Sequence, residues 1–125
     1  MVVLRPIVLS TMTASEGFLE FVHLPTYQRS SAKLIDDEGQ RTIEAELCEN
    51  PEAGDTVAGS GGVRKLRVAL PGGGKRGGAR LIYFYRERRG RIYLILLYPK
   101  GRKDNLTKAE CNEMRKLTAM LESEQ

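Results

Sequence analysis

Hydrophobic and polar residues alternate with a period of two through the second half of the chain. In residues 63–70 (VRKLRVAL), the leucines and the valine of LRVAL point to one side, whereas Lys65 and Arg67 point to the other. Residues 79–89 (ARLIYFYRERR) repeat the alternation. Residues 91–100 (RIYLILLYPK) form an almost unbroken apolar run, which is typical of a central strand. We therefore predict a three-stranded antiparallel meander, joined by a glycine-rich loop and an Arg-Gly turn.

Shorter patterns precede the meander. Residues 18–24 (FLEFVHL) predict a short strand, and residues 26–35 (TYQRSSAKLI) predict a weak helix. A second helix is expected from about residue 37 to residue 50, where Pro51 stops it. Gly39 costs its first turn about 1 kcal/mol relative to alanine, so that turn is expected to fray. Three acids of this helix are expected on a solvated face: Glu44, Glu46 and Glu49.

A third helix is predicted to begin at Thr107. The sequence TKAE is a capping-box pattern, in which Thr107 and Glu110 satisfy exposed backbone donors. An apolar stripe at helical spacing follows: Met114, Leu117 and Leu121. No internal repeat is visible, so we expect one domain over residues 17–125 and a loosely ordered extension over residues 1–16.

Composition narrows the class of protein. The 125 residues are 41% apolar and 29% charged, which suits one small folded domain. No apolar run approaches the roughly 20 residues that a membrane-spanning helix needs. The first residues lack the long apolar stretch of a signal peptide, so we expect a cytoplasmic protein.

Charge is strongly segregated along the chain. Residues 64–103 hold 13 of the 20 cations and one acid, a net charge of +12, whereas the rest of the chain carries −8. Such a basic segment favours a polyanionic partner over a merely soluble hairpin.

The glycine-rich loop matches the dinucleotide pattern GxGxxG at Gly72, Gly74 and Gly77. That pattern needs a helix after it, whereas a strand is predicted here. A phosphate-binding loop of the Walker type is excluded by Ala69 and Arg76, which replace its first glycine and its magnesium-binding hydroxyl. We interpret the segment as a hairpin loop with cations that contact phosphates.

Residues suited to metal or nucleophilic chemistry are few. Cys48 and Cys111 have no CxxC spacing and are expected to be free thiols, and His23 is the single histidine. A zinc site and a Ser-His-Asp triad are therefore not expected. We predict that the protein uses no metal and no cofactor.

Several motifs, taken together and in order, resemble those of a known family. ENPEAGD, GGVRKLRV, the Gly-Lys-rich loop, GGARLIYFY, GRIYLILLYPK and KDNLT are similar to the HigB branch of the RelE/ParE toxin superfamily, over about residues 18–121. The resemblance implies an α+β fold: a small antiparallel sheet of RelE type with an N-terminal helical hairpin and a C-terminal helix. It also implies a type II toxin that cuts mRNA in the ribosomal A site. Its partners would be mRNA, the ribosome and a helix-turn-helix antitoxin, which alone contacts operator DNA.

The resemblance also assigns site residues. The family's catalytic cations map onto Lys65, Arg67, Arg80 and Lys100. The position of a tyrosine found in many relatives holds Leu106, so Tyr98 is the candidate replacement. The other expected RNA-binding residues are Arg64, Lys75, Arg76, Arg102 and Lys103. Tyr83, Tyr85 and Tyr93 offer further aromatic surface, although core packing is the expected role of each.

Cations alone can support RNA cleavage by the neighbouring 2′-hydroxyl. Arg67 and Arg80 would stabilise the negative charge of the transition state. Lys65 would act as the base, and Lys100 or Arg102 would serve the leaving oxygen. Two alternatives stay open: a ParE-like inhibitor of DNA gyrase, and an RNA-binding module without catalysis. The clustered cations favour cleavage over the gyrase inhibitor, whereas mutation of Arg80 would separate a catalyst, which loses activity, from a plain binder, which loses only a fraction of its affinity.

Overall fold

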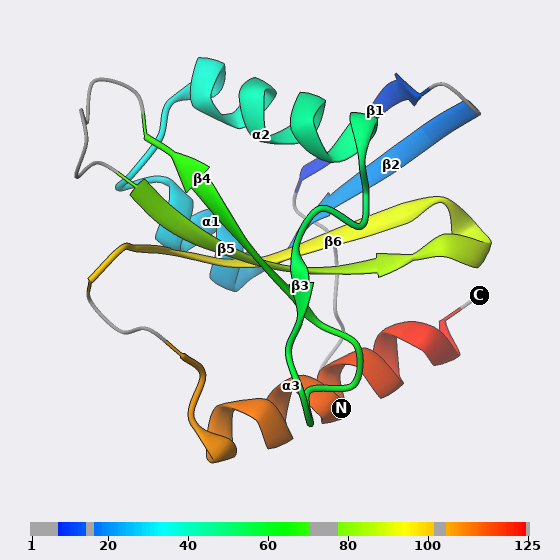
Figure 1. Cartoon of the computed structure of the whole chain (residues 1–125). Helices are drawn as coiled ribbons and strands as arrows, with labels where there is room; N and C mark the ends of the chain where they lie inside the picture. Colours follow the sequence, from blue (N-terminus) through cyan, green and yellow to red (C-terminus); the bar gives the residue numbers. More distant parts are fainter. Residues whose placement is uncertain (1–7, 15–16, 71–77, 102–104, 125) are drawn as a thin grey trace.

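The computed structural model describes residues 8–14, 17–70, 78–101 and 105–124, and it shows an α+β fold, as expected (Figure 1). A six-stranded mixed sheet has the order β1-β2-β6-β5-β4-β3. The strands are β1 (Val8–Ala14), β2 (Gly17–His23), β3 (Asp55–Thr56), β4 (Arg64–Ala69), β5 (Gly78–Arg86) and β6 (Arg91–Pro99). The helices are α1 (Pro25–Ser31), α2 (Asp37–Glu49) and α3 (Lys108–Ser123), with a 3₁₀ turn η2 (Glu87–Arg89).

The predicted meander is confirmed as β4, β5 and β6, which pair antiparallel in chain order. β6 lies between β5 and β2, and its side chains are buried on both faces, as its continuous apolar run predicted. One pair departs from a wholly antiparallel sheet, because β2 runs parallel to β6. This parallel pair joins the N-terminal strands to the meander.

A strand at the N-terminal side was not predicted. β1 pairs antiparallel with β2 along its whole length, which corrects the expectation of a loosely ordered segment for residues 8–14. Its sequence, VLSTMTA, contains β-branched residues but no clean polar–apolar alternation, so the local signal for a strand is weak. Residues 1–7 and 15–16 lie outside the described residues.

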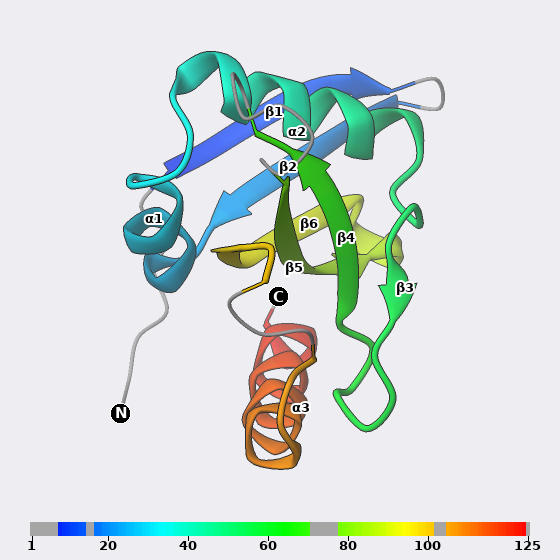
Figure 2. The ribbon, with the colours of Figure 1, turned by 60° about the vertical axis from the view of Figure 1, so that its left-hand side comes forward.

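Helices cover both faces of the sheet (Figures 1 and 2). α1 and α2 share one core with the sheet, in which Tyr27, Ile43 and Leu47 contact buried residues of the strands. α3 packs on the opposite face, where Leu121 belongs to a second core cluster. Within the meander, Leu81 and Tyr83 belong to the first cluster and Ile82 and Phe84 to the second, as a period of two requires.

A buried polar network links β2 to the helical hairpin. The Nε2 atom of His23 lies 3.0 Å from Oε2 of Glu44, and both side chains are 8% exposed. Gln40 donates to the same carboxylate oxygen at 2.7 Å and accepts from the Tyr27 hydroxyl. The prediction that Glu44 lies on a solvated face is therefore wrong, whereas Glu46 is exposed as expected. The network satisfies the polar groups that burial would otherwise leave unpaired.

The start of α2 shows why a glycine stands in its first turn. Asp36 caps the helix by accepting from the backbone N–H of Gly39 at 2.9 Å. A Cβ atom at Gly39 would lie 3.0 Å from Cβ of Ile35, a tight contact that would require Ile35 to shift by a few tenths of an ångström. The turn is thus capped, with Gly39 buried, rather than frayed. α1 ends at Ser31, four residues earlier than predicted, and a turn connects it to α2.

The third helix begins as its sequence predicts. Both bonds of the capping box between Thr107 and Glu110 are present. Leu121 is buried and Met114 and Leu117 pack against the same core, which confirms the apolar stripe. The other end is held by Arg86, whose guanidinium donates to three carbonyl oxygens at 2.6–2.9 Å: those of Leu121, Glu122 and Glu124.

Candidate functional site

Strand register brings two predicted catalytic arginines directly together. Arg67 of β4 pairs with Arg80 of β5, and Arg80 pairs in turn with Tyr98 of β6. Paired residues on neighbouring strands point to the same face, with Cβ atoms about 5 Å apart. The row Arg67–Arg80–Tyr98 therefore crosses the meander on the α3 face, because Tyr98 belongs to the α3-side core.

The two predicted lysines lie on the same face. Lys65 pairs with Ile82, a member of the α3-side core. Lys100 donates its backbone N–H to the carbonyl of Gly78 at 2.9 Å, and its side chain passes close to Gly78. Gly78 lies two residues before Arg80 on β5 and hence shares its face. All four predicted catalytic cations therefore occupy one face of the meander: Lys65, Arg67, Arg80 and Lys100.

The electrostatics of this cationic face favour an anionic ligand. Like charges directly opposite each other destabilise a sheet, so the Arg67–Arg80 pair needs a counter-charge. Among the residues that the structure describes, no carboxylate forms an ion pair with either guanidinium. Arg67 is exposed and Arg80 is half-buried, so both can reach a ligand from solvent. Each guanidinium group can bind a phosphate in a bidentate manner, through two parallel N–H···O hydrogen bonds.

Asn105 is a site residue that the sequence reasoning missed. The Nζ atom of Lys65 donates to Oδ1 of Asn105 at 3.0 Å, across 40 positions of the chain. The bond orients the Lys65 ammonium group toward the connection between β6 and α3. Asn105 lies in the KDNLT motif, so the motif itself was a usable signal.

Arg64 was predicted to bind RNA, but the structure directs it elsewhere. It pairs with Tyr83, which belongs to the core under α2, so Arg64 points to the face opposite Lys65. Its guanidinium donates to the carbonyls of Glu52 and Gly54 and to the Glu52 carboxylate. Arg64 therefore anchors the segment before β4 and does not join the cationic face.

Four other predicted RNA-binding residues lie outside the described residues: Lys75, Arg76, Arg102 and Lys103.

The tyrosines of the meander serve mainly as core residues. Tyr83 and Tyr93 are at most 1% exposed, so neither offers a stacking surface. The Tyr83 hydroxyl accepts from the N–H of Gly54 and donates to the carbonyl of Pro51, and burial raises its pKa above the ordinary value. Tyr98 is 6% exposed and packs in the α3-side core. Leu106 packs against that core as well, which gives this position an apolar role here.

A family model described as RelE toxin of the RelE / RelB toxin-antitoxin system matches residues 27–125. The matched segment begins within α1 and contains α2, the whole meander and α3. Within the described ranges, no helix combines the length and apolarity needed to cross a membrane. In the same ranges, no three or more His, Cys, Asp or Glu side chains are grouped as metal ligands would be.

Proposed function

This chain belongs to the RelE family of toxins of toxin–antitoxin modules, and from that premise we propose that it cleaves mRNA on the ribosome. The observation that carries the proposal is the Arg67–Arg80 pair on the α3 face of the meander, with Lys65 and Lys100 on the same face. A sheet that places two arginines opposite each other gains most when a phosphate neutralises them.

The proposed reaction is transesterification by the RNA itself. The 2′-oxygen attacks the adjacent phosphorus, the bond from phosphorus to the 5′-oxygen breaks, and the products are a 2′,3′-cyclic phosphate and a 5′-hydroxyl. Arg67 and Arg80 stabilise the charge that accumulates on the phosphate oxygens, which is usually the largest catalytic contribution. Lys65 in its neutral form takes the proton of the 2′-hydroxyl, and Lys100 donates a proton to the departing 5′-oxygen.

Dependence on the ribosome has a physical reason in this arrangement. The side chains of Arg67 and Lys100 are exposed, so they can bind phosphate but do not orient a ribose. In-line attack requires the 2′-oxygen, the phosphorus and the 5′-oxygen to be aligned. We propose that the ribosomal A site supplies this alignment, which places the toxin in the cytoplasm.

The family assignment also supports an antitoxin as partner. We propose a helix-turn-helix antitoxin that neutralises the toxin and carries it to operator DNA. Its toxin-binding surface would be acidic where it covers the cationic face, because residues 64–103 carry a net charge of +12.

The test is the integrity of mRNA after incubation of the purified chain with programmed ribosomes. Cleavage is expected with ribosomes only, and Arg80→Ala should abolish it with little loss of ribosome binding. Cleavage of free RNA at the same rate would contradict ribosome dependence. Intact mRNA together with inhibited supercoiling by gyrase would replace the proposal with the ParE-like activity.

A further inference from the structure

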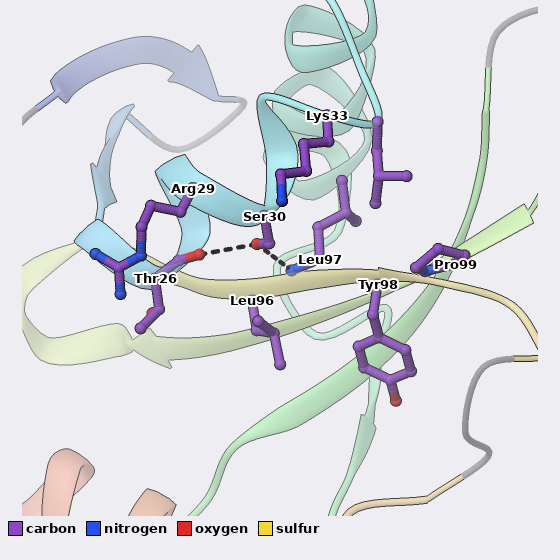
Figure 3. A pocket seen from close by; sticks show the side chains of 9 residues that line it. Thr26, Arg29, Ser30, Lys33, Leu96, Leu97, Tyr98 and Pro99 are labelled. Carbon is purple, nitrogen blue, oxygen red and sulfur yellow. Dashed lines mark hydrogen bonds between the residues drawn. The ribbon is translucent and has the colours of Figure 1, made fainter.

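A groove of about 560 Å³ runs between α1 and the end of β6 (Figure 3). Arg29 and Lys33 approach it from the side of α1, and Leu97 and Pro99 line it from β6. Its volume is in the range of pockets that bind small ligands. The reaction proposed above makes no use of this groove.

The groove arises where β6 loses its neighbouring strand. The pairing of β2 with β6 ends at Leu94, and beyond it hydroxyl groups of α1 bond the edge of β6. Thr26 donates to the carbonyl of Ile95, and the N–H of Leu97 donates to the Ser30 hydroxyl at 3.0 Å. These hydrogen bonds fix α1 against the strand, so the groove is built into the fold. Pro99 has no N–H, which prevents another strand from pairing fully with this edge.

The lining of the groove is cationic and apolar. Arg29 and Lys33 are exposed, and no acidic residue is found among the described residues that line the groove. Neither cation forms an ion pair with a described carboxylate. Leu34, Leu96 and Pro99 add apolar surface beside these charges. The groove therefore suits a ligand that is anionic at one end and apolar at the other.

Tyr98 connects the groove to the cationic face. It lines the groove and is also the residue paired with Arg80. In Figure 3, Leu96 and Tyr98 project to one side of β6, whereas Leu97 and Lys33 lie on the other. A chain bound on the cationic face can thus continue past Tyr98, around the edge of β6, to Arg29.

We propose that this groove binds a nucleotide of single-stranded RNA next to the phosphate held by Arg67 and Arg80. Arg29 and Lys33 each contact a phosphate of the RNA, and the base covers the apolar surface formed by Leu96 and Pro99. The identity of the ligand rests on the proposed RNA cleavage. Continuity with the cationic face favours RNA over an acidic segment of the antitoxin.

The experiment measures binding of fluorescein-labelled single-stranded RNA to the full chain by anisotropy. A fully 2′-O-methylated 12-mer is used, because it cannot be cleaved by its own 2′-oxygens. The double variant Arg29→Gln/Lys33→Gln should bind the 12-mer about tenfold more weakly at low salt. Its slope of log K against log salt should fall by about 1.4, which corresponds to two phosphate contacts on a single strand.

The matched control is Arg88→Gln/Arg89→Gln. These two exposed cations of η2 precede β6, at the end opposite the groove, and their loss removes the same charge. If the two double variants weaken RNA binding equally, the effect comes from the loss of net charge alone, and the proposal is overturned. A tenfold loss of antitoxin affinity with unchanged RNA binding would assign the groove to the antitoxin instead, which also overturns it. Thermal melts of both variants verify that they fold.

This test separates the groove from the proposed cleavage. Binding of non-cleavable RNA does not depend on catalysis or on ribosomes. If Arg29→Gln/Lys33→Gln weakens RNA binding and the parent chain fails to cut programmed mRNA, RNA binding in the groove is supported and the proposed cleavage is refuted. Normal binding by Arg29→Gln/Lys33→Gln in a chain that does cut would refute only the groove.

Discussion

Replacing Arg86 by methionine should detach the end of α3 from the sheet. The guanidinium of Arg86 donates to the carbonyls of Leu121, Glu122 and Glu124 at the C-terminal end of α3, where the helix itself supplies few donors. Methionine keeps most of the apolar stem and removes the charge and all three donors. The variant therefore isolates the contribution of these hydrogen bonds.

The magnitude follows from the number and exposure of the bonds. Hydrogen bonds to a charged group contribute roughly 1.5–3 kcal/mol each when buried. Two of the three are partly buried and the third is exposed, so we count about one full bond and discount the others. The favourable position of a cation at a helix C-terminus adds about 0.5 kcal/mol. We expect a loss of about 2–3 kcal/mol in the free energy of unfolding, or of local opening of α3.

The assay combines urea unfolding with amide hydrogen exchange. Protection of the last two turns of α3 should fall by about 30- to 150-fold in Arg86→Met. Arg88→Met serves as the control, since Arg88 is an exposed neighbour in η2, and it should stay within about 0.5 kcal/mol of the parent. Unchanged stability and unchanged exchange in Arg86→Met would refute the clamp.

Three further predictions concern stability. Tyr83→Phe should cost about 1–3 kcal/mol at neutral pH, because two backbone groups lose their partner. Burial raises the Tyr83 pKa above about 10, so the neutral phenol stabilises the fold fully below that pH and progressively less above it. In urea unfolding from about pH 9 to pH 11, the difference in unfolding free energy between parent and variant should therefore narrow. A constant difference would contradict this. Glu44→Ala should lose about 2 kcal/mol in urea unfolding, and exposed Glu46→Ala less than about 0.5; equal losses would argue against the buried network. Thr107→Ala should lower the free energy of unfolding by about 1 kcal/mol and lower the helical circular dichroism at the start of thermal unfolding. An unaltered melt would show that the capping box does not stabilise α3.

Local sequence patterns predicted the strands of the meander, but they could not predict which strands distant in the sequence pair with each other. A period of two is visible within each of β4 and β5, and the apolar run of β6 marks a strand buried on both faces. The parallel contact of β2 with β6 joins residues 20–23 to residues 91–94. Nothing local in either segment specifies that partner. β1 was missed for a related reason, because its sequence has little alternation.

The candidate site was predictable to the extent that it follows from alternation. Lys65, Arg67 and Arg80 share a face because of strand periodicity and the register of one hairpin. The same rule sends Arg64 to the opposite face, although its charge alone suggested RNA binding. The approach of Asn105 to Lys65 depends on the path of the chain after β6, which no periodicity encodes.

Buried polar residues gave the least reliable expectations. Glu44 lies between Ile43 and Leu47 on the inner side of α2, a spacing that helical periodicity could have revealed. Its partner His23 ends β2, 21 positions earlier, so the hydrogen bond exists only in the folded chain. Charge alone suggested solvent exposure, and packing decided otherwise.

The central claim is that the cationic face cuts mRNA through the RNA's own 2′-oxygen. The most direct measurement compares single-turnover cleavage of two ribosome-bound mRNAs, one with ribose and one with 2′-deoxyribose at the scissile position of the A-site codon. We predict that the ribose mRNA is cut to a 2′,3′-cyclic phosphate and that the deoxy mRNA stays intact. Arg80→Ala should slow cleavage of the ribose mRNA at least 100-fold, on the order expected for loss of a group that stabilises transition-state charge. Cleavage of the deoxy mRNA, or an undiminished rate in Arg80→Ala, would contradict the account.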